Sequence, residues 1–232
     1  MSGEPREGKA RARKIVVEAI IPSPVALVWE RSQVPQFHTA WDIRFNHIAY
    51  LDETDERGYH LMDYRTNIAL GIAIQGYGRY LTNSEHSHSS FEFDSYDWKS
   101  LIRNGRGIWL YRADGPSVES PSVERTLFKT VYDYEVRYGW MGEMLDRLLF
   151  RSLLQLATEW GFETLRQWCA GDENATAHRR SRMQFAWFYL RRRCGWPAAQ
   201  GAARSWLGTG QVAETLYEKA LCAEAAANGR AK

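Results

Sequence analysis

The stretch that decides the fold of this chain is residues 140–169, WMGEMLDRLLFRSLLQLATEWGFETLRQWC. Its apolar residues recur every three or four positions and its charged residues occupy the rest of the circumference, which predicts one unbroken amphipathic helix. At about 1.5 Å per residue this helix would span roughly 40 Å. Gly161 is its only expected weak point. One wide apolar face needs an equally wide partner, and the strand-rich sequence before the helix is the candidate.

The sequence at the start of the folded region predicts one strand followed by two short helices. Residues 14–21 are β-branched and apolar, and they stop at Pro22-Ser23-Pro24. Ser23 is expected to cap a helix over residues 25–31, with Pro24 in its first turn. A second short helix is expected over residues 34–39.

Six further segments are rich in aromatic or β-branched residues and are separated by polar turns, which predicts strands joined mostly as hairpins. They are residues 42–51, 58–66, 76–82, 89–95, 105–112 and 126–138. In the last segment Phe128, Tyr132 and Tyr134 fall on one face, because side chains alternate along a strand. This aromatic face should meet the long helix. The predicted fold class is α+β, with about seven antiparallel strands.

This order of elements resembles the START-like superfamily, also called SRPBCC, which includes polyketide cyclases and aromatases, lipid-transfer domains and the birch pollen allergen. The resemblance rests on IPSPVALVWE at 21–30, WD at 41–42, the predicted sheet and the final helix. SLIR at 100–103, TVYDYEVRYG at 130–139 and ATEW at 157–160 carry a more specific similarity. The resemblance covers about residues 14–169 and implies a helix-grip fold, in which the sheet wraps around the long helix. The more specific similarity is to an uncharacterised bacterial subgroup, so it implies no particular activity.

Length allows one large domain or a domain plus an appendage, and the basic residues gathered near both ends favour the second. The chain has 232 residues, 44% of them hydrophobic, and a net charge of +2. We expect a disordered basic arm at 1–13, the helix-grip domain at 14–170 and a basic, partly helical extension at 171–232. The polar amino terminus does not resemble a secretory signal, and no apolar run is long enough to span a membrane. Three widely spaced cysteines disfavour a disulfide framework, so a cytoplasmic setting is expected.

A sheet that covers one side of a helix tends to leave a space between them, and the superfamily uses that space for hydrophobic ligands. A filled core is the alternative. Aromatic strand residues and apolar helix residues are the candidates for its lining: Tyr64, Trp109, Tyr111, Tyr132, Tyr134, Tyr138, Phe150, Leu153, Ala157 and Trp160. Trp160 is expected between helix and sheet. Because a buried hydroxyl needs a partner, the tyrosines suggest a guest with a polar group, or water.

Charged residues near the predicted space have two interpretations each. Arg103 or Arg106, which have glycines beside them, could hold an acidic headgroup, but pairing with carboxylates at the surface is the alternative. His38 and Asp42 could act as acid and base. Turn chemistry favours the structural alternative, in which Asp42 caps backbone groups and Trp41 plugs the end of the barrel. The pair His86 and His88 lacks a third ligand, so neither a metal nor a cofactor is predicted.

The predicted function is binding of a hydrophobic or aromatic small molecule, lipid-like or polyketide-like, between sheet and helix. One alternative is an enzyme of the cyclase, aromatase or dehydratase kind that acts on such a molecule. The other is an interaction module, because the apolar run 183–190 lies between arginine clusters that suit an anionic membrane or a protein partner, more than a nucleic acid. In the opposite interpretation this run folds back onto the domain, which we expect to fold without residues after 170.

Overall fold

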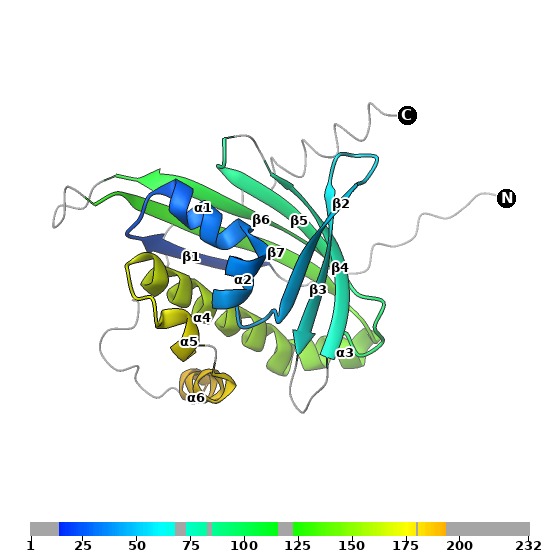
Figure 1. Ribbon diagram of the computed structural model, residues 1–232. Helices are drawn as coiled ribbons and strands as arrows, with labels where there is room; N and C mark the ends of the chain where they lie inside the picture. Colours follow the sequence, from blue (N-terminus) through cyan, green and yellow to red (C-terminus); the bar gives the residue numbers. More distant parts are fainter. Residues whose placement is uncertain (1–13, 68–72, 83–84, 116–122, 180, 194–232) are drawn as a thin grey trace.

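A seven-stranded antiparallel sheet curves around one long helix in the computed structural model of the chain (Figure 1). The structure describes residues 14–67, 73–82, 85–115, 123–179 and 181–193, so the predicted arm at 1–13 and residues 194–232 lie outside the described residues. The sheet has the order β1-β7-β6-β5-β4-β3-β2. Its strands are β1 (Ile15–Ile21), β2 (His47–Thr54), β3 (His60–Asn67), β4 (Ala73–Thr82), β5 (His88–Asp94), β6 (Ile102–Asp114) and β7 (Arg125–Val136). The predicted α+β helix-grip architecture is confirmed.

Two short helices, α1 (Val25–Gln33) and α2 (Pro35–Trp41), follow β1 as predicted. Ser23 does not cap α1, because its hydroxyl donates to the backbone oxygen of Cys169 at 2.8 Å and the helix has no side-chain cap. Ser23 therefore joins the start of α1 to the end of the long helix. The strand predicted from residue 42 begins only at His47, since residues 42–46 form the turn that carries the candidate site.

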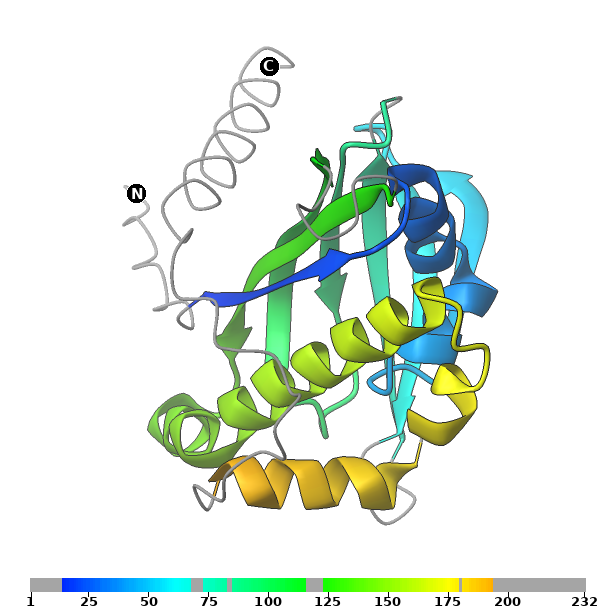
Figure 2. The same ribbon diagram turned by 90° about the vertical axis from the view of Figure 1, so that its left-hand side faces the viewer.

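The long helix covers the predicted residues but is not one regular α-helix. It consists of α3 (Gly139–Leu145), the π-helical turn η1 (Asp146–Phe150) and α4 (Arg151–Cys169), and its direction changes near η1 (Figure 2). Gly161, the expected weak point, lies inside regular α4. A Cβ at this position would lie 3.2 Å from Cζ3 of Trp41, so the glycine allows Trp41 to approach the helix backbone closely.

The main core lies between α4 and the sheet. Phe128 of β7 stacks on Phe162 of α4 with 4.5 Å between ring centroids, and both side chains are buried. Tyr132 and Tyr134 share the inward face of β7 with Phe128, as the alternation predicted. Rings that interlock in this way fill the space beneath α1 and α2 and contribute packing beyond the burial of apolar area.

Beyond α4 the described part of the carboxy-terminal extension contains α5 (Ala175–Arg179) and α6 (Arg182–Arg193). Both lie on the side of α4 that faces away from the sheet (Figure 2). Within the apolar run 183–190, Phe185 and Phe188 pack against Trp160 with ring centroids 6.0 and 5.0 Å away. The side of α6 that carries these two rings therefore folds back onto the domain. The division of the chain at residue 170 stays a prediction.

Candidate functional site

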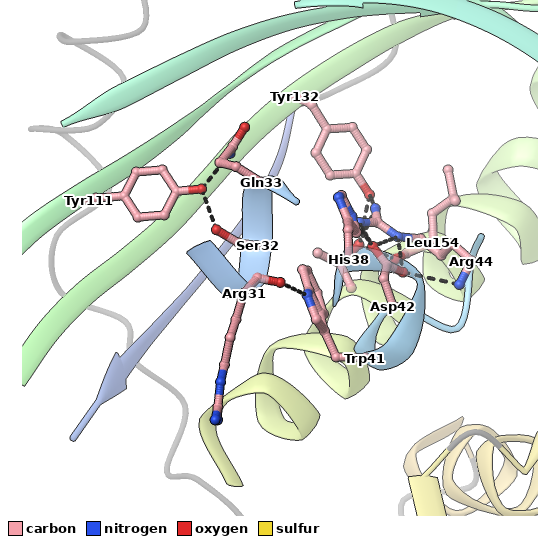
Figure 3. A network of polar contacts seen from close by, with 11 residues as sticks. Arg31, Ser32, Gln33, His38, Trp41, Asp42, Arg44, Tyr111, Tyr132 and Leu154 are labelled. Carbon is pink, nitrogen blue, oxygen red and sulfur yellow. Dashed lines mark hydrogen bonds and ion pairs between the residues drawn. The ribbon is translucent and has the colours of Figure 1, made fainter. Parts of the chain in front are cut away.

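A cluster of polar side chains is buried where the end of α2 meets β7 and α4 (Figure 3). We call it the Arg44 cluster, and it consists of His38, Asp42, Arg44, Tyr132 and Thr158. At its centre Nε of Arg44 donates to Oδ1 of Asp42 at 2.9 Å, and Nη2 donates to Oδ2 at 2.7 Å. The Asp42 side chain is fully buried, while Arg44 keeps 15% of its side-chain surface exposed.

The local chain geometry explains why Arg44 turns inward. Helix α2 ends at Trp41, and the backbone N–H of Arg44 donates to Oδ1 of Asp42 at 3.0 Å, which folds residue 44 back over the carboxylate. His38, one helical turn earlier, places Nε2 3.3 Å from Oδ2 of Asp42. Asp42 thus accepts a backbone N–H, as the structural interpretation of this motif predicted, and it also binds a cation.

The other side of the Arg44 guanidinium contacts two hydroxyl groups. Nη1 donates to Oγ1 of Thr158 at 2.9 Å and to the Tyr132 hydroxyl at 3.3 Å. Because the hydrogen of Thr158 goes to the backbone oxygen of Leu154, the Tyr132 hydroxyl must donate to Thr158, 2.9 Å away. The cluster therefore links the α2–β2 turn, β7 and α4 through one continuous set of hydrogen bonds.

The electrostatics of the cluster keep Asp42 and Arg44 ionised. Burial alone would raise the pKa of the Asp42 carboxyl, but the charge of Arg44 and the hydrogen bonds from His38 and Arg44 hold this pKa well below its usual range. Burial raises the pKa of the Tyr132 hydroxyl, which stays protonated. The pair carries no net charge, so the cluster suits neutral hydrogen-bonding groups better than an anion.

The hydroxyls of the other predicted lining tyrosines also have protein partners. Tyr111 is 2.8 Å from the Ser32 hydroxyl and accepts from Gln33 at 2.6 Å, and Tyr134 donates to Oδ1 of Asp146 at 2.7 Å. Tyr64 donates to a backbone oxygen in β5. The inference from tyrosine hydroxyls to a polar guest is therefore wrong, because the protein itself satisfies these groups.

Three predicted contacts are also wrong because the side chains lie elsewhere. Arg103 and Arg106 point to the sheet face opposite Tyr132, where Nε of each lies 3.3 and 3.4 Å from Glu135 and Asp133, respectively. Tyr138 follows the end of β7 in a left-handed conformation, with φ of 67°, and is exposed. None of the three lines the space between sheet and helix.

Trp160 is buried, but not between helix and sheet as predicted. Its Nε1 donates to the backbone oxygen of Arg179 at 2.7 Å, and the Arg179 guanidinium lies 3.7 Å from its ring centroid. Phe162, which was not among the predicted lining residues, takes the position against the sheet and stacks on Phe128. Because α4 is apolar on two sides, periodicity alone does not show which side packs on the sheet and which packs on α6.

The other residues between sheet and helix fall into two groups, one fully buried and one half-buried. Trp109 and Tyr111 are buried in the core beneath α1 and α2. Apolar residues farther along the concave face, at the end of η1 and on the first turn of α4 are only half-buried: Phe45, Met62, Phe91, Phe93, Phe150 and Leu154. We call these half-buried residues the inner apolar wall. Leu153 is half-buried too, but it lies seven residues before Trp160 and so on the Trp160 side of α4, not on the side that faces the sheet. Ala157 is buried.

Two glycines on the concave face of the sheet leave room for neighbouring aromatic rings to lie against the backbone. Gly76 of β4 is paired with Tyr64, and Gly105 of β6 is paired with Phe93. A Cβ at either glycine would overlap the ring of its neighbour, so the rings of Tyr64 and Phe93 lie flat against the sheet backbone. Rings in this orientation do not project across toward α4.

Comparison with known proteins gives one sequence relative. An uncharacterized membrane protein from Bacillus subtilis (strain 168), YndG, is 34% identical over 185 residues, which cover 78% of this chain. The chain spans 66% of the length of that relative. No family model matches the chain. Among the described residues no helix is both long and apolar enough to cross a bilayer, and no group of His, Cys, Asp or Glu side chains is arranged to hold a metal ion.

Two solved structures are similar to this chain at low sequence identity. The structure of TTHA0849 from Thermus thermophilus has a TM-score of 0.51 and 15% identity, and the match covers 68% of this chain and 97% of that one. A START superfamily protein from Mycobacterium smegmatis has a TM-score of 0.47 and 11% identity, over 66% and 97% of the two chains. At this identity the likeness concerns the fold alone.

Proposed function

Because the chain has the START-like helix-grip fold, we propose that it holds a hydrophobic or aromatic small molecule between the concave face of the sheet and the first turns of α4. The observation that carries the proposal is the inner apolar wall, whose side chains come from both sheet and helix and retain accessible surface. Enclosed apolar side chains that keep partial exposure are typical of concave binding sites. The guest would be lipid-like or polyketide-like in size and polarity.

The flat rings of Tyr64 and Phe93 support this proposal. Side chains that merely filled a core would project toward the facing helix and interlock with it, as Phe128 does with Phe162. Here the glycines at positions 76 and 105 let the rings lie down on the sheet instead. The concave surface between β3 and β6 would thereby present ring faces, which suit an apolar or aromatic guest.

Within the Arg44 cluster, the guanidinium of Arg44, whose side chain stays partly exposed, would receive the polar part of the guest. It lies beside this wall, since the Arg44 guanidinium is 5.5 Å from the ring centroid of Phe45 and 5.8 Å from that of Tyr132. Asp42 neutralises the guanidinium, so a carbonyl or hydroxyl group would fit better than a carboxylate or phosphate. His38 and Asp42, the acid and base candidates, are engaged with each other and with Arg44, so we propose binding rather than catalysis.

The proposal is tested by enlarging one residue of the inner apolar wall. The variant Phe93→Trp should reduce the affinity for the neutral apolar fluorophore N-phenyl-1-naphthylamine about tenfold, or roughly 1.4 kcal/mol, because the larger ring occupies the guest's space. The control Phe37→Trp changes an exposed ring of α2 and should leave the affinity unchanged. Equal affinities for both variants and the wild type would contradict binding at this wall.

A second candidate function is contact between the carboxy-terminal extension and an anionic membrane. Helix α6, with the sequence RMQFAWFYLRRR, carries four arginines and no acidic residue, and the relative from B. subtilis is named as a membrane protein. We propose that α6 lies on the anionic cytoplasmic face of a membrane, which attracts basic segments by about 1 kcal/mol per Lys or Arg. A protein partner is the alternative. Changing Arg191, Arg192 and Arg193 to Gln should weaken sedimentation with anionic vesicles.

A further inference from the structure

The most exposed apolar side chains of the long helix lie on α3 and η1. Trp140 is 77% exposed and Leu148 is 59% exposed, although periodicity places Leu148 on the predicted buried face. Met141, Met144, Leu145 and Leu149 are exposed as well. Contiguous apolar surface of this kind is unusual on a soluble monomer and marks an interaction site.

These exposed side chains belong to a helix that is firmly attached to the domain. Asp146 is buried, accepts the Tyr134 hydroxyl at 2.7 Å and lies 3.7 Å from Nε of Arg151. Gly142 is also buried, and a Cβ there would overlap the backbone oxygen of Arg137. Two anchored positions on one side of the helix therefore hold the apolar side chains outward on the other.

Further exposed rings and cations adjoin this helix. The Tyr138 hydroxyl donates to the backbone oxygen of Trp98, whose side chain is 76% exposed. Nη2 of Arg193 donates to the backbone oxygen of Leu148 at 2.5 Å, so the end of α6 lies beside η1. The side chains of α6 that do not pack on Trp160 include Met183, Trp187 and Leu190, and they too are exposed.

We infer that α3, η1 and the outward side of α6 together form a docking surface for an anionic phospholipid bilayer. Trp and Tyr favour the boundary between headgroups and acyl chains, and Leu and Met supply the apolar area that enters it. The arginines of α6 supply positive charge beside the apolar side chains, and of these Arg192 lies 3.7 Å from Glu159. Arg147 is 80% exposed but lies 3.9 Å from the carboxylate of Glu143, so the net positive charge of the surface comes from α6. The inference rests on the membrane contact proposed for α6 and adds a second element to it.

The test is co-sedimentation of the full chain with vesicles of phosphatidylcholine, with and without about one fifth phosphatidylserine. The double variant Trp140→Ser and Leu148→Ser should lower binding to the anionic vesicles about 100-fold, since each lost side chain removes buried apolar area. Both residues are exposed, so the thermal unfolding midpoint should not fall. The control Leu81→Ser removes an exposed leucine of β4 and should bind as the wild type does.

The outcomes separate this inference from the function proposed for α6. If changing Arg191, Arg192 and Arg193 to Gln weakens binding while the double serine variant binds normally, the inference fails and the α6 proposal stands. If the wild type binds no vesicle, both fail. Equal binding without phosphatidylserine would overturn the anionic specificity. A change of oligomeric mass in the double variant, measured by light scattering, would assign the surface to a second copy of the chain instead.

Discussion

Asp42 and Arg44 form an ion pair inside the domain, in the turn between α2 and β2. One local hydrogen bond, from the backbone N–H of Arg44 to the Asp42 carboxylate, holds the two residues together. The backbone N–H of Arg44 binds the same carboxylate oxygen as its own Nε. A carboxylate buried without a partner is costly, whereas a complete pair is close to neutral for stability. The energetic value of each member therefore depends on the other.

Replacing Arg44 by Met should lower the free energy of unfolding by about 3–5 kcal/mol, because Asp42 is left buried without its cation. The double variant Asp42→Asn and Arg44→Met should recover part of this loss, since no charge remains. Unfolding in urea measures both. The matched control is Arg147→Met at the surface, with an expected change within about 0.5 kcal/mol. A loss below about 1 kcal/mol for Arg44→Met would show that the pair is not desolvated.

Only part of this site was predictable from residues that are near in sequence. The sequence indicates a possible site at His38, Trp41 and Asp42, and the end of α2 explains why the Asp42 carboxylate accepts a backbone N–H. The partner Thr158 lies 114 residues after Arg44, and Tyr132 lies 88 residues after it. Such contacts depend on how α4 is rotated against β7, which no local pattern specifies. Arg103 and Arg106 were misplaced because alternation assigns faces only relative to a neighbouring strand.

Among the helices and strands, too, local patterns predict some features and not others. The seven strands and both short helices were predictable because alternation and polar turns mark them locally. The two apolar sides of α4 were not distinguishable, since each has suitable rings at helical spacing. In the structure Trp160 lies against α6, so the carboxy-terminal extension covers a part of α4 that would otherwise be exposed.

Changing Trp160 to Ala should cost about 3–5 kcal/mol of unfolding free energy and should also loosen α6, because the rings of Phe185 and Phe188 lose their partner. Limited digestion with trypsin reports on α6, which contains cleavable arginines at 182, 191, 192 and 193. Cleavage there should become faster in the variant than in the wild type. If stability falls without faster cleavage in α6, the ring contact does not hold this helix.

At the scale of the whole molecule, buried tyrosines connect its stability to alkaline pH. Burial raises the pKa of Tyr111 and Tyr134 well above the ordinary value, and the carboxylate of Asp146 adds to the effect at Tyr134. In the unfolded chain these hydroxyls ionise near pH 10. Their contribution to stability is therefore fully present below that pH and is lost as the pH rises toward the folded values.

When the pH is raised, the tyrosines should therefore ionise in two steps, which phenolate absorbance measures. Tyrosines that are open to solvent should ionise near the ordinary value of about pH 10. The buried ones should ionise only together with the loss of helical circular dichroism. Phenolate formation by all 12 tyrosines in one step near pH 10, with structure retained, would show that the interior is open to solvent.

The π-helical turn η1 has a consequence for how sequences of this fold are aligned. A hydrogen bond from residue i to i+5 encloses one residue more than the bond of an α-helix, and one residue corresponds to about 100° of rotation. Leu145 and Leu148 therefore do not continue the direction of Leu156, although their spacing suggests it. Alignment with a protein whose helix is regular here should require a gap of one residue between 145 and 151. Deleting one residue of η1 should turn α3 by about 100° about its own axis and so remove Gly142 from its close contact with the backbone of Arg137.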